Sequence, residues 1–402
     1  MTGQLTGQLT GHLAALGIVN ALGRGKARVA EGLLQGDTSG LVLEAGWLPG
    51  REARVGRVQG ELAPPPPAFA MDDSRNTRLA LAALAEIRDE VDRALARYGR
   101  GRVGVVLGTS TSGIEATERA VAHQRAQGSF PPEFHYRQQE IGRLAPFIAE
   151  YLGLRGPAIT VSTACTSSGK AMASARQLIH SGICDAVITG GSDSLCRLTL
   201  NGFASLESAT PSLCNPMSRH RRGINIGEGA ALFLMTREPA EFSLLGAGAS
   251  SDAHHISSPD PSGRGAEAAM REALLDAGLA ANQVGYVNLH ATATPKNDEM
   301  ESRAMAAVFP AGVPCSGTKP LTGHALGASA AMELAFCWLA LQRTWNPEGL
   351  LPPHRWDGEA DPELPALRLL GEGAQWGAAG ICMSNAFAFG GNNLSLILGP
   401  TR

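Results

Sequence analysis

The chain has 402 residues, of which 44% are hydrophobic and 18% are charged, and its formal net charge is -3. This composition is typical of a globular protein with one large domain or two ordinary ones, and it excludes a disordered chain. The charge provides no basic surface for nucleic acid, and no apolar run reaches the roughly 18 residues of a membrane-spanning helix, so we expect neither kind of partner.

Seven cysteines are spread along the chain without a CxxC pair. Because their number is odd and the chain is too long to need disulfide staples, we expect reduced thiols in a cytoplasmic protein. The first 16 residues lack the basic start and apolar centre of a secretory signal. We interpret their TGQL repeat as a frayed leader before a first element in the segment LAALGIVNAL.

The first half of the chain alternates helical patterns with short apolar strands. A proline run in residues 63–70 predicts an extended, exposed break, and the amphipathic pattern after it predicts one long helix over residues 74–99. Further strands are expected at 102–108, 157–163 and 185–191, and further helices at 115–127, 141–153 and 166–182.

The same alternation recurs after Phe242, with helices expected at 266–278, 297–309 and 323–342 and strands at 284–292 and 313–318. The strands are continuous runs of Val, Ile and Leu, which is typical of a parallel sheet covered on both faces, so the fold class is α/β. In each half a polar loop, holding Cys165 or His324, leads into a helix of small residues. We therefore predict two duplicated α/β halves, residues 1–241 and 242–402, whose helix N-termini meet at one site.

Cys165, in the segment TVSTACTSSGKAM, lies where a predicted strand gives way to a helix. The thiolate is the nucleophilic form of cysteine, and the partial positive charge of a helix N-terminus favours it. The small residues that follow leave room for a substrate carbonyl. A buried and inert cysteine is the open alternative.

Two histidines are the candidate partners of this thiol. His290 ends a predicted strand, and the carboxyl ends of parallel strands carry ligand and catalytic groups. His324 lies near two glycines at a predicted helix start. A core histidine and a helix-capping histidine are the alternatives. Neither residue belongs to an HExxH or CxxC…H pattern, so we expect no metal site.

Three charged residues lie near these histidines in the sequence. Lys319 precedes His324 by five residues, in a Gly- and Thr-rich loop. Asp298 and Glu301 lie near the start of the predicted helix 297–309, where an acidic residue ordinarily complements the helix dipole.

The glycine-rich segments GTSTSG, TGGSDS, GINIGEG and AFAFGGNN match neither GxxxxGK[ST] nor a helix-opening GxGxxG, so nucleotide binding is not supported. In the last of them, Phe387 and Phe389 flank a small residue ahead of paired glycines. This pattern indicates either a mobile turn that faces the substrate or a hydrophobic plug at a strand end.

The segments TACTSSGKA, NLHATATPKND, GTKPLTGHALGASAAMEL and SNAFAFGGNN, in this order, resemble those of the β-ketoacyl–acyl carrier protein synthases of the Cys-His-His type. The resemblance runs from about residue 17 to the C-terminus. It implies the thiolase fold, a five-layered αβαβα sandwich. It also implies an acyltransferase that condenses an acyl chain, held on cysteine, with malonyl carrier protein in fatty acid, polyene or polyketide biosynthesis.

The resemblance assigns roles residue by residue. It makes Cys165 the acyl-accepting nucleophile, and it places the backbone N–H of Cys165 with that of the gating residue Phe389 in an oxyanion hole. The remaining catalytic set is His290, His324, Lys319 and Glu301, and the substrate-binding set is Thr292, Thr294, Asp298 and Phe387. Alanines at 291 and 388, where glycine is usual, and Asn392, where threonine is usual, depart from the pattern and could narrow the site or stiffen the gate.

The partner implied by the resemblance is acyl carrier protein, whose phosphopantetheine carries the substrates, and no metal or redox cofactor is implied. A homodimer, or a heterodimer with a related ketosynthase-like subunit, is implied as well. A degradative thiolase would want a second cysteine in the segment SNAFAFGGNN, which has none. A chain-length-factor subunit would lack the nucleophile, but the active half of such a heterodimer stays open, as does the acyl substrate.

Overall fold

The computed structural model describes residues 11–377 and 380–402. The TGQL repeat therefore lies outside the described residues, apart from its final glycine. The strands are β1 (Gly11–Asn20), β2 (Gly23–Arg24), β3 (Leu41–Leu48), β4 (Arg51–Gly56), β5 (Val103–Gly108), β6 (Ala158–Val161), β7 (Ala186–Asp193), β8 (Ile226–Gly227), β9 (Gly229–Thr236), β10 (Phe242–Ser251), β11 (Tyr286–Leu289), β12 (Pro314–Gly317), β13 (Arg368–Leu369), β14 (Cys382–Ala388) and β15 (Asn392–Pro400). The helices are α1 (Lys26–Gln35), α2 (Arg75–Ala85), α3 (Arg88–Tyr98), α4 (Ile114–Gln127), α5 (Leu144–Leu152), α6 (Ser167–His180), α7 (Arg197–Ser205), α8 (Arg264–Ala277), α9 (Pro295–Val308), α10 (Lys319–Thr322) and α11 (Ser329–Leu341).

The strand order shows the duplication that the sequence predicts. The first half orders its strands β1-β9-β7-β5-β6, and the second half orders them β10-β15-β14-β11-β12. If the five strands of each set are numbered 1 to 5 along the chain, both sets have the same spatial order, 1-5-4-2-3. In each set the last three strands of this order are parallel to one another, whereas the first two strands make antiparallel pairs. The two sets are joined where β1 pairs with β10. The proposed boundary between residues 241 and 242 falls between β9 and β10.

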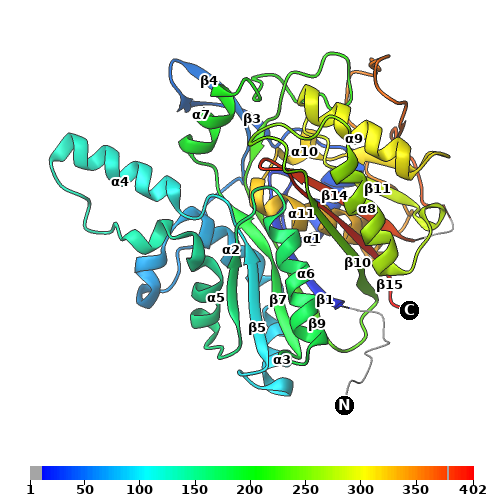
Figure 1. Cartoon of the computed structure of the whole chain (residues 1–402). Helices are drawn as coiled ribbons and strands as arrows, with labels where there is room; N and C mark the ends of the chain where they lie inside the picture. The colour runs from blue at the N-terminus through cyan, green and yellow to red at the C-terminus, as the bar shows by residue number, and fades with distance from the viewer. Residues whose placement is uncertain (1–10, 378–379) are drawn as a thin grey trace.

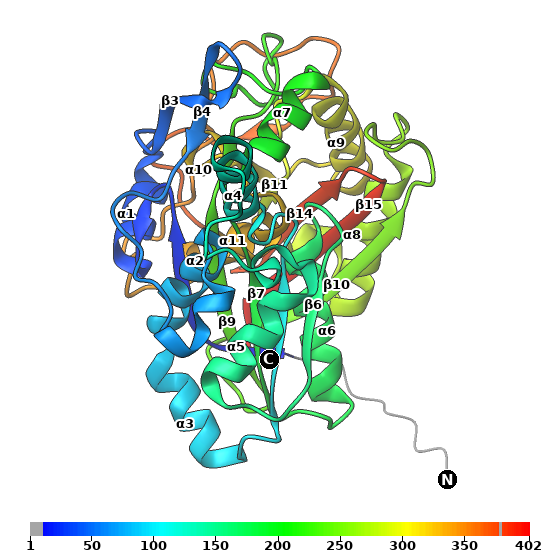
Figure 2. The ribbon, with the colours of Figure 1, turned by 90° about the vertical axis from the view of Figure 1, so that its left-hand side faces the viewer.

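The helices and strands stack in five layers (Figure 1 and Figure 2), which three hydrophobic cores hold together. One core packs α2, α3 and α5 on the outer face of the first set of strands. A second packs α8 and α9 on the outer face of the second set. The third lies between the two sets and contains residues of α1, α6 and α11. The αβαβα layering expected from the resemblance is therefore present.

The sequence of helix α11 is apolar on every side because the helix is surrounded by the rest of the chain. All its residues from Ser329 to Ala340 are buried, as expected of a helix in the middle layer of the fold. Its small N-terminal residues allow close approach to α6, and the backbone N–H of Ala331 donates to Oγ of Ser168 at 3.0 Å. The helices that begin beside the two predicted site loops thus meet in the centre of the molecule.

The predicted helix over 74–99 is wrong in one respect, because it is two helices. α2 ends at Ala85 and α3 begins at Arg88. Between them Glu86 accepts a hydrogen bond from the backbone N–H of Ile18 at 3.3 Å, and it pairs with Lys26 at 3.6 Å. A contact to β1, remote in sequence, therefore sets the break.

The predicted helix 323–342 begins later than expected. Gly323 has φ 70 and Leu326 has φ 47, both in the left-handed region, so the chain forms α10, a turn and a 3-10 helix before α11. The proline run is extended only to residue 66, after which a 3-10 helix spans Pro67–Asp72. The small sheet β3-β4-β8 was not predicted.

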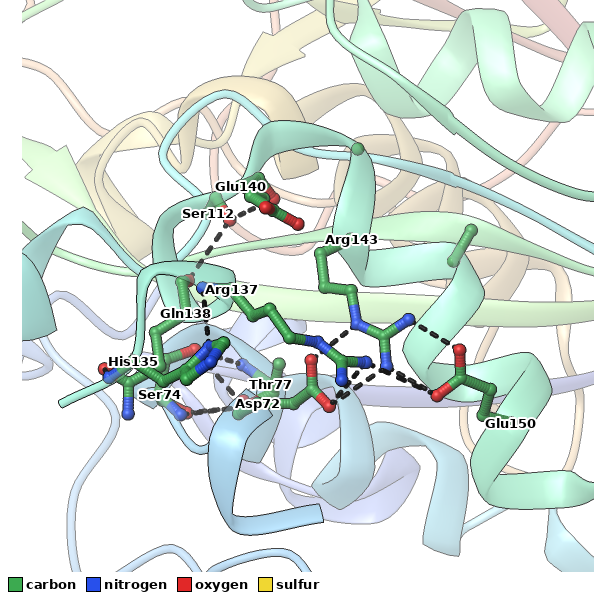
Figure 3. A network of polar contacts seen from close by, with 12 residues as sticks. Asp72, Ser74, Thr77, Ser112, His135, Arg137, Gln138, Glu140, Arg143 and Glu150 are labelled. Carbon is green, nitrogen blue, oxygen red and sulfur yellow. Dashed lines mark hydrogen bonds and ion pairs between the residues drawn. The ribbon is translucent and has the colours of Figure 1, made fainter. Parts of the chain in front are cut away.

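Helix α4 projects away from the rest of the chain (Figure 1), and its last residues are exposed. The segment that returns from it is fixed at its base by Arg143, whose guanidinium donates to Asp72 at 2.5 Å and to Glu150 at 2.6 Å (Figure 3). None of the helices in residues 11–377 and 380–402 combines the length and the hydropathy that a bilayer crossing requires.

Candidate active site

The structure brings Cys165, His290 and His324 together from both halves of the chain. The sulfur of Cys165 lies 2.9 Å from Nε2 of His324. The two imidazole rings are 5.3 Å apart between centroids. Cys165 follows β6, and His290 follows β11, so both lie at carboxyl ends of parallel strands. His324 lies in the turn between α10 and α11.

Cys165 is held as a thiol. Burial raises the pKa of the Cys165 thiol to about 12, although the nearby ammonium of Lys319 and the backbone N–H of Phe389 both favour the thiolate. The expectation that the N-terminus of α6 would favour the thiolate is therefore outweighed by desolvation. Since Phe389 donates its N–H to the sulfur, this N–H is placed for the oxyanion-hole role predicted for it.

Both histidines are neutral in this site. Burial, followed by the charge of Lys319, lowers the pKa of His290 and of His324 well below the usual value. Nδ1 of His290 accepts from the ammonium of Lys319 at 3.3 Å, so this imidazole holds its proton on Nε2, from which it can donate to an oxygen. Nδ1 of His324 lies 3.1 Å from the hydroxyl of Ser329, a group that both donates and accepts.

Lys319 is part of a buried charge pair that the sequence analysis missed. Its Nζ lies 2.5 Å from Oε1 of Glu333, and it also donates to the backbone carbonyl of His290. Both side chains of the pair are almost completely buried. The sequence offers one indication of this role, because Glu333 is the single acidic residue in the otherwise apolar run SAAMELAFCWLAL.

Glu301 supports the site through backbone hydrogen bonds. It does not contact either imidazole ring; it accepts the backbone N–H groups of His290 and Ala291, each at 2.7 Å. Ala291 has φ 43, which costs a non-glycine residue roughly 1–2 kcal/mol. Glu301 thus holds a strained backbone, and burial raises the pKa of its carboxyl to about 7.

Asp298 does the same for the next residues, so its predicted contact with substrate is wrong. Its carboxylate accepts from the backbone of Ala293 at 3.1 Å and of Met217 at 2.8 Å, both of which have positive φ. Asp298 is fully buried and does not line the cavity beside Cys165. Burial raises the pKa of this carboxyl to about 6.

A cavity of about 420 Å³ leads to Cys165. Its wall includes the other residues predicted for the site, namely His290, His324, Thr292, Thr294, Phe387 and Phe389. The two threonine hydroxyls are 2.9 Å apart. The wall also includes Phe203, whose ring packs against that of Phe389 with centroids 5.2 Å apart and the planes tilted by 35°. The sequence analysis quoted the segment of Phe203 but did not select this residue.

The predicted gate is the turn between β14 and β15. Gly390 and Gly391 form it with φ 84 and φ 78, which suit glycine. Ala388 is the last residue of β14 and has no positive φ, so alanine is accommodated there without backbone strain. Asn392 accepts a hydrogen bond from Nζ of Lys170 at 2.7 Å, which ties the turn to α6.

Among the described residues, Cys165, His290 and His324 also form the group that could hold a metal ion, because one ligand atom from each lies within 4.8 Å of the others. The ammonium of Lys319 beside His290 opposes a second cation at this place. The expectation of no metal stays a prediction.

A cysteine and two neutral imidazoles at the bottom of a cavity, in a duplicated α/β fold, define a condensing enzyme of the thiolase fold. The chain belongs to the beta-ketoacyl synthase family. The family model described as "Beta-ketoacyl synthase, N-terminal domain" matches residues 60–240, and "Beta-ketoacyl synthase, C-terminal domain" matches residues 242–351.

Three similar proteins illustrate this relationship. Nodulation protein E of Rhizobium meliloti is 34% identical over 307 residues, which is 73% of this chain and 75% of that protein. The 3-oxoacyl-[acyl-carrier-protein] synthase 2 of Vibrio cholerae is 30% identical over 74% of this chain and 75% of its own. One chain of the structure of a ketosynthase (ApeO) in complex with its chain length factor (ApeC) from Xenorhabdus doucetiae matches with 45% identity and a TM-score of 0.92, and the match covers 100% of the present chain and 100% of that chain. The present chain is accordingly an acyltransferase that acts as a condensing ketosynthase in fatty acid or polyketide biosynthesis.

Proposed function

We propose that Cys165 accepts the acyl chain from a carrier thioester. The observation that carries this proposal is the position of its sulfur, which lies at the cavity and 2.9 Å from Nε2 of His324. The sulfur attacks the thioester carbonyl, its proton passes to the departing carrier thiol, and a new thioester forms on Cys165. The Phe389 N–H, which now faces the sulfur, stabilises the oxyanion of this step.

The second step joins the extender unit. A malonyl thioester on another carrier loses carbon dioxide, and the Nε2–H groups of His290 and His324 stabilise the resulting enolate oxygen. The enolate carbon attacks the acyl carbonyl, a carbon–carbon bond forms, and the thiolate of Cys165 leaves and takes up a proton. Lys319 supports this role because it fixes Nδ1 of His290 as the acceptor nitrogen. The steps need no metal or redox cofactor.

The carrier partner is proposed from the shape of the site. Thr292 and Thr294 line the passage to Cys165, where their hydroxyls would bind the amide groups of a phosphopantetheine arm. The seven cysteines are all unpaired, which supports a reducing compartment such as the cytoplasm.

The second subunit is proposed to be a related chain that resembles a chain length factor. The comparison that favours it is the 45% identity to one chain of the ketosynthase and chain length factor complex, against 30–34% for the curated relatives above. Because Cys165 is present, this chain would be the active half of the pair. The strand β6 ends the sheet with Ile159 45% exposed, and an unpaired edge of this kind is a template for another chain.

The acylation proposal is tested by incubating the protein with acyl carriers of varied length and unsaturation and measuring its intact mass. We expect one acyl adduct, located on the peptide of Cys165, that is lost in Cys165→Ala. The matched control is Cys196→Ala, since Cys196 is equally buried but does not line the cavity. An adduct that persists in Cys165→Ala would refute the assignment.

The histidine roles are tested separately. We expect His290→Ala to retain acyl transfer and to lose malonyl-carrier decarboxylation, whereas His255→Ala, at the exposed mouth of the cavity, retains both. Decarboxylation at the normal rate in His290→Ala would overturn the enolate assignment. The partner proposal fails if the chain alone is a fully active homodimer by light scattering and turnover.

A further inference from the structure

A single carboxylate, that of Asp193, connects the two sides of the site. Asp193 is the last residue of β7 and is completely buried. Its Oδ1 accepts from the hydroxyl of Thr109 at 2.5 Å and from the backbone and hydroxyl of Thr111, each at 2.9 Å. The backbone N–H of Ser110 donates to both oxygens, at 2.8 and 3.0 Å. On the other side, the backbone N–H of Gly327 donates to Oδ2 at 2.6 Å.

One branch of this network leads to the nucleophile. The turn of residues 109–112, which Asp193 holds, carries Ser110, and Oγ of Ser110 donates to the backbone carbonyl of Ala164 at 3.1 Å. Ala164 immediately precedes Cys165 and has φ 53, so the chain enters the nucleophile position in a strained conformation. Asp193 therefore acts on the position of Cys165 through Ser110.

The other branch leads to the histidine. Gly327 follows Leu326, which has φ 47, and both lie in the short segment between His324 and α11. A side chain at Gly327 would collide with Oδ2 of Asp193 at 2.7 Å and with Ser110 at 2.5 Å, so the close approach requires glycine. The carboxylate thus holds the turn that carries His324 against the turn that supports Cys165.

The outer side of the same turn is also fixed. Ser112 has φ 46, and its hydroxyl donates to the backbone carbonyl of Glu140 at 3.0 Å. Figure 3 shows this contact beside the cluster in which Arg143 binds Asp72 and Glu150. The turn is therefore held on one side by Asp193 and on the other by a segment that is itself anchored.

We propose that Asp193 is the positioning residue that sets the distance between the sulfur of Cys165 and Nε2 of His324. Three strained residues, Ser112, Ala164 and Leu326, flank its hydrogen bonds, and the carboxylate holds them in place. The inference rests on the proposed function, because it assumes that this distance serves acyl transfer and decarboxylation.

Asp193→Asn should have two opposite effects, because the lost negative charge makes the Cys165 thiol more reactive whereas the lost hydrogen bonds misplace it for acyl transfer. The carboxylate of Asp193 is among the groups that raise the pKa of the Cys165 thiol, so removal of its charge alone would make the thiol more reactive. Asparagine keeps one acceptor oxygen and places an NH2 donor where the other stood, so the side chain no longer accepts from both turns, and Cys165 and His324 are misplaced relative to each other. We expect alkylation by iodoacetamide to be unchanged or faster in Asp193→Asn, while acyl transfer and malonyl-carrier decarboxylation both fall by at least tenfold.

Two further variants separate position from folding. Ser192→Ala removes a buried hydrogen bond from the neighbouring residue of β7, to the backbone carbonyl of Asn76 at 2.9 Å, and leaves every hydrogen bond of the Asp193 carboxylate in place. We expect it to leave both reactions within twofold of wild type. Ser110→Ala removes only the branch to Ala164, so acyl transfer should fall about tenfold while decarboxylation stays within twofold, and this result holds even if Asp193→Asn does not fold.

The measurements are initial rates of adduct formation, carbon dioxide release and iodoacetamide alkylation, on protein whose circular dichroism matches wild type. The proposal is overturned if Asp193→Asn behaves like Ser192→Ala, or if Ser110→Ala loses both reactions equally or neither. If the wild type itself gains no acyl mass on Cys165, the proposed function fails instead, and this outcome is seen before any variant is compared.

Discussion

Replacing Glu333 with glutamine tests how the buried charge pair supports the site. The side chains of Lys319 and Glu333 are 2% and 3% exposed, with 2.5 Å between Nζ and Oε1. Glutamine keeps the shape of the side chain and one acceptor oxygen, but it removes the negative charge. The ammonium of Lys319 is then buried without a counter-charge.

The expected cost follows from the depth of the pair. Removing one partner of a buried ion pair costs ~3–5 kcal/mol, and unit charges 4 Å apart attract by about 4 kcal/mol at an effective dielectric constant of 20. The amide oxygen retains a hydrogen bond worth roughly 1 kcal/mol. We therefore expect Glu333→Gln to lower the free energy of unfolding by about 2–4 kcal/mol.

Urea unfolding followed by tryptophan fluorescence measures this loss, since Trp338 lies on the same helix as Glu333. The matched control is Glu299→Gln, which breaks an exposed pair with Arg303 whose side chains are 39% and 43% exposed, and should cost less than about 0.5 kcal/mol. Replacing both members, Lys319→Met with Glu333→Leu, should come within roughly 1 kcal/mol of wild type. The reasoning is refuted if Glu333→Gln loses no more than Glu299→Gln, or if the double replacement loses more than the single one.

Burial lowers the pKa of His354 to about 4 from 6.5. Because the unfolded chain then binds the proton first, stability should be lost as pH falls from about 6.5 to 4, by up to roughly 3 kcal/mol, and His354→Gln should flatten this part of the pH–stability curve. Ala291→Gly should raise the free energy of unfolding by about 1 kcal/mol, because glycine adopts φ 43 without strain. Ala388→Gly, in β14, should lower the free energy of unfolding by about 0.5–1 kcal/mol. Thermal melts in which both variants change stability in the same direction would contradict this account. Phe203→Ala enlarges the cavity and removes the ring that packs against Phe389, so the ratio of initial rates for long over short acyl carriers should rise roughly tenfold. An unchanged ratio would exclude Phe203 as a determinant of chain length.

The sequence was informative wherever a signal was local. Apolar runs placed β5, β7 and β11, and the repeated loop-to-helix pattern placed Cys165 and His324 at related positions of two halves. Polarity and spacing also selected Lys319, which does contact His290. Each of these inferences depends on residues within one turn or one strand.

The rest depends on contacts that the chain makes only when folded. The break after α2 is set by the backbone of Ile18, and the role of Glu301 is set by two backbone N–H groups rather than by a ring. Asp193 lies in the segment TGGSDS, which the sequence analysis considered only as a nucleotide-binding motif. Its partner Gly327 is 134 residues away, and no periodicity reports such a contact.

The middle layer has a consequence for the order in which the protein acquires reactivity. Cys165 and His324 are 159 residues apart and are brought together where α6 packs against α11. A nascent chain that has emerged through β9 possesses the sulfur but neither imidazole, and the apolar face of its α6 is still uncovered. Docking of the C-terminal half therefore completes the hydrophobic interior and the catalytic site in a single event. A ribosome that stalls midway yields an aggregation-prone, catalytically inactive fragment.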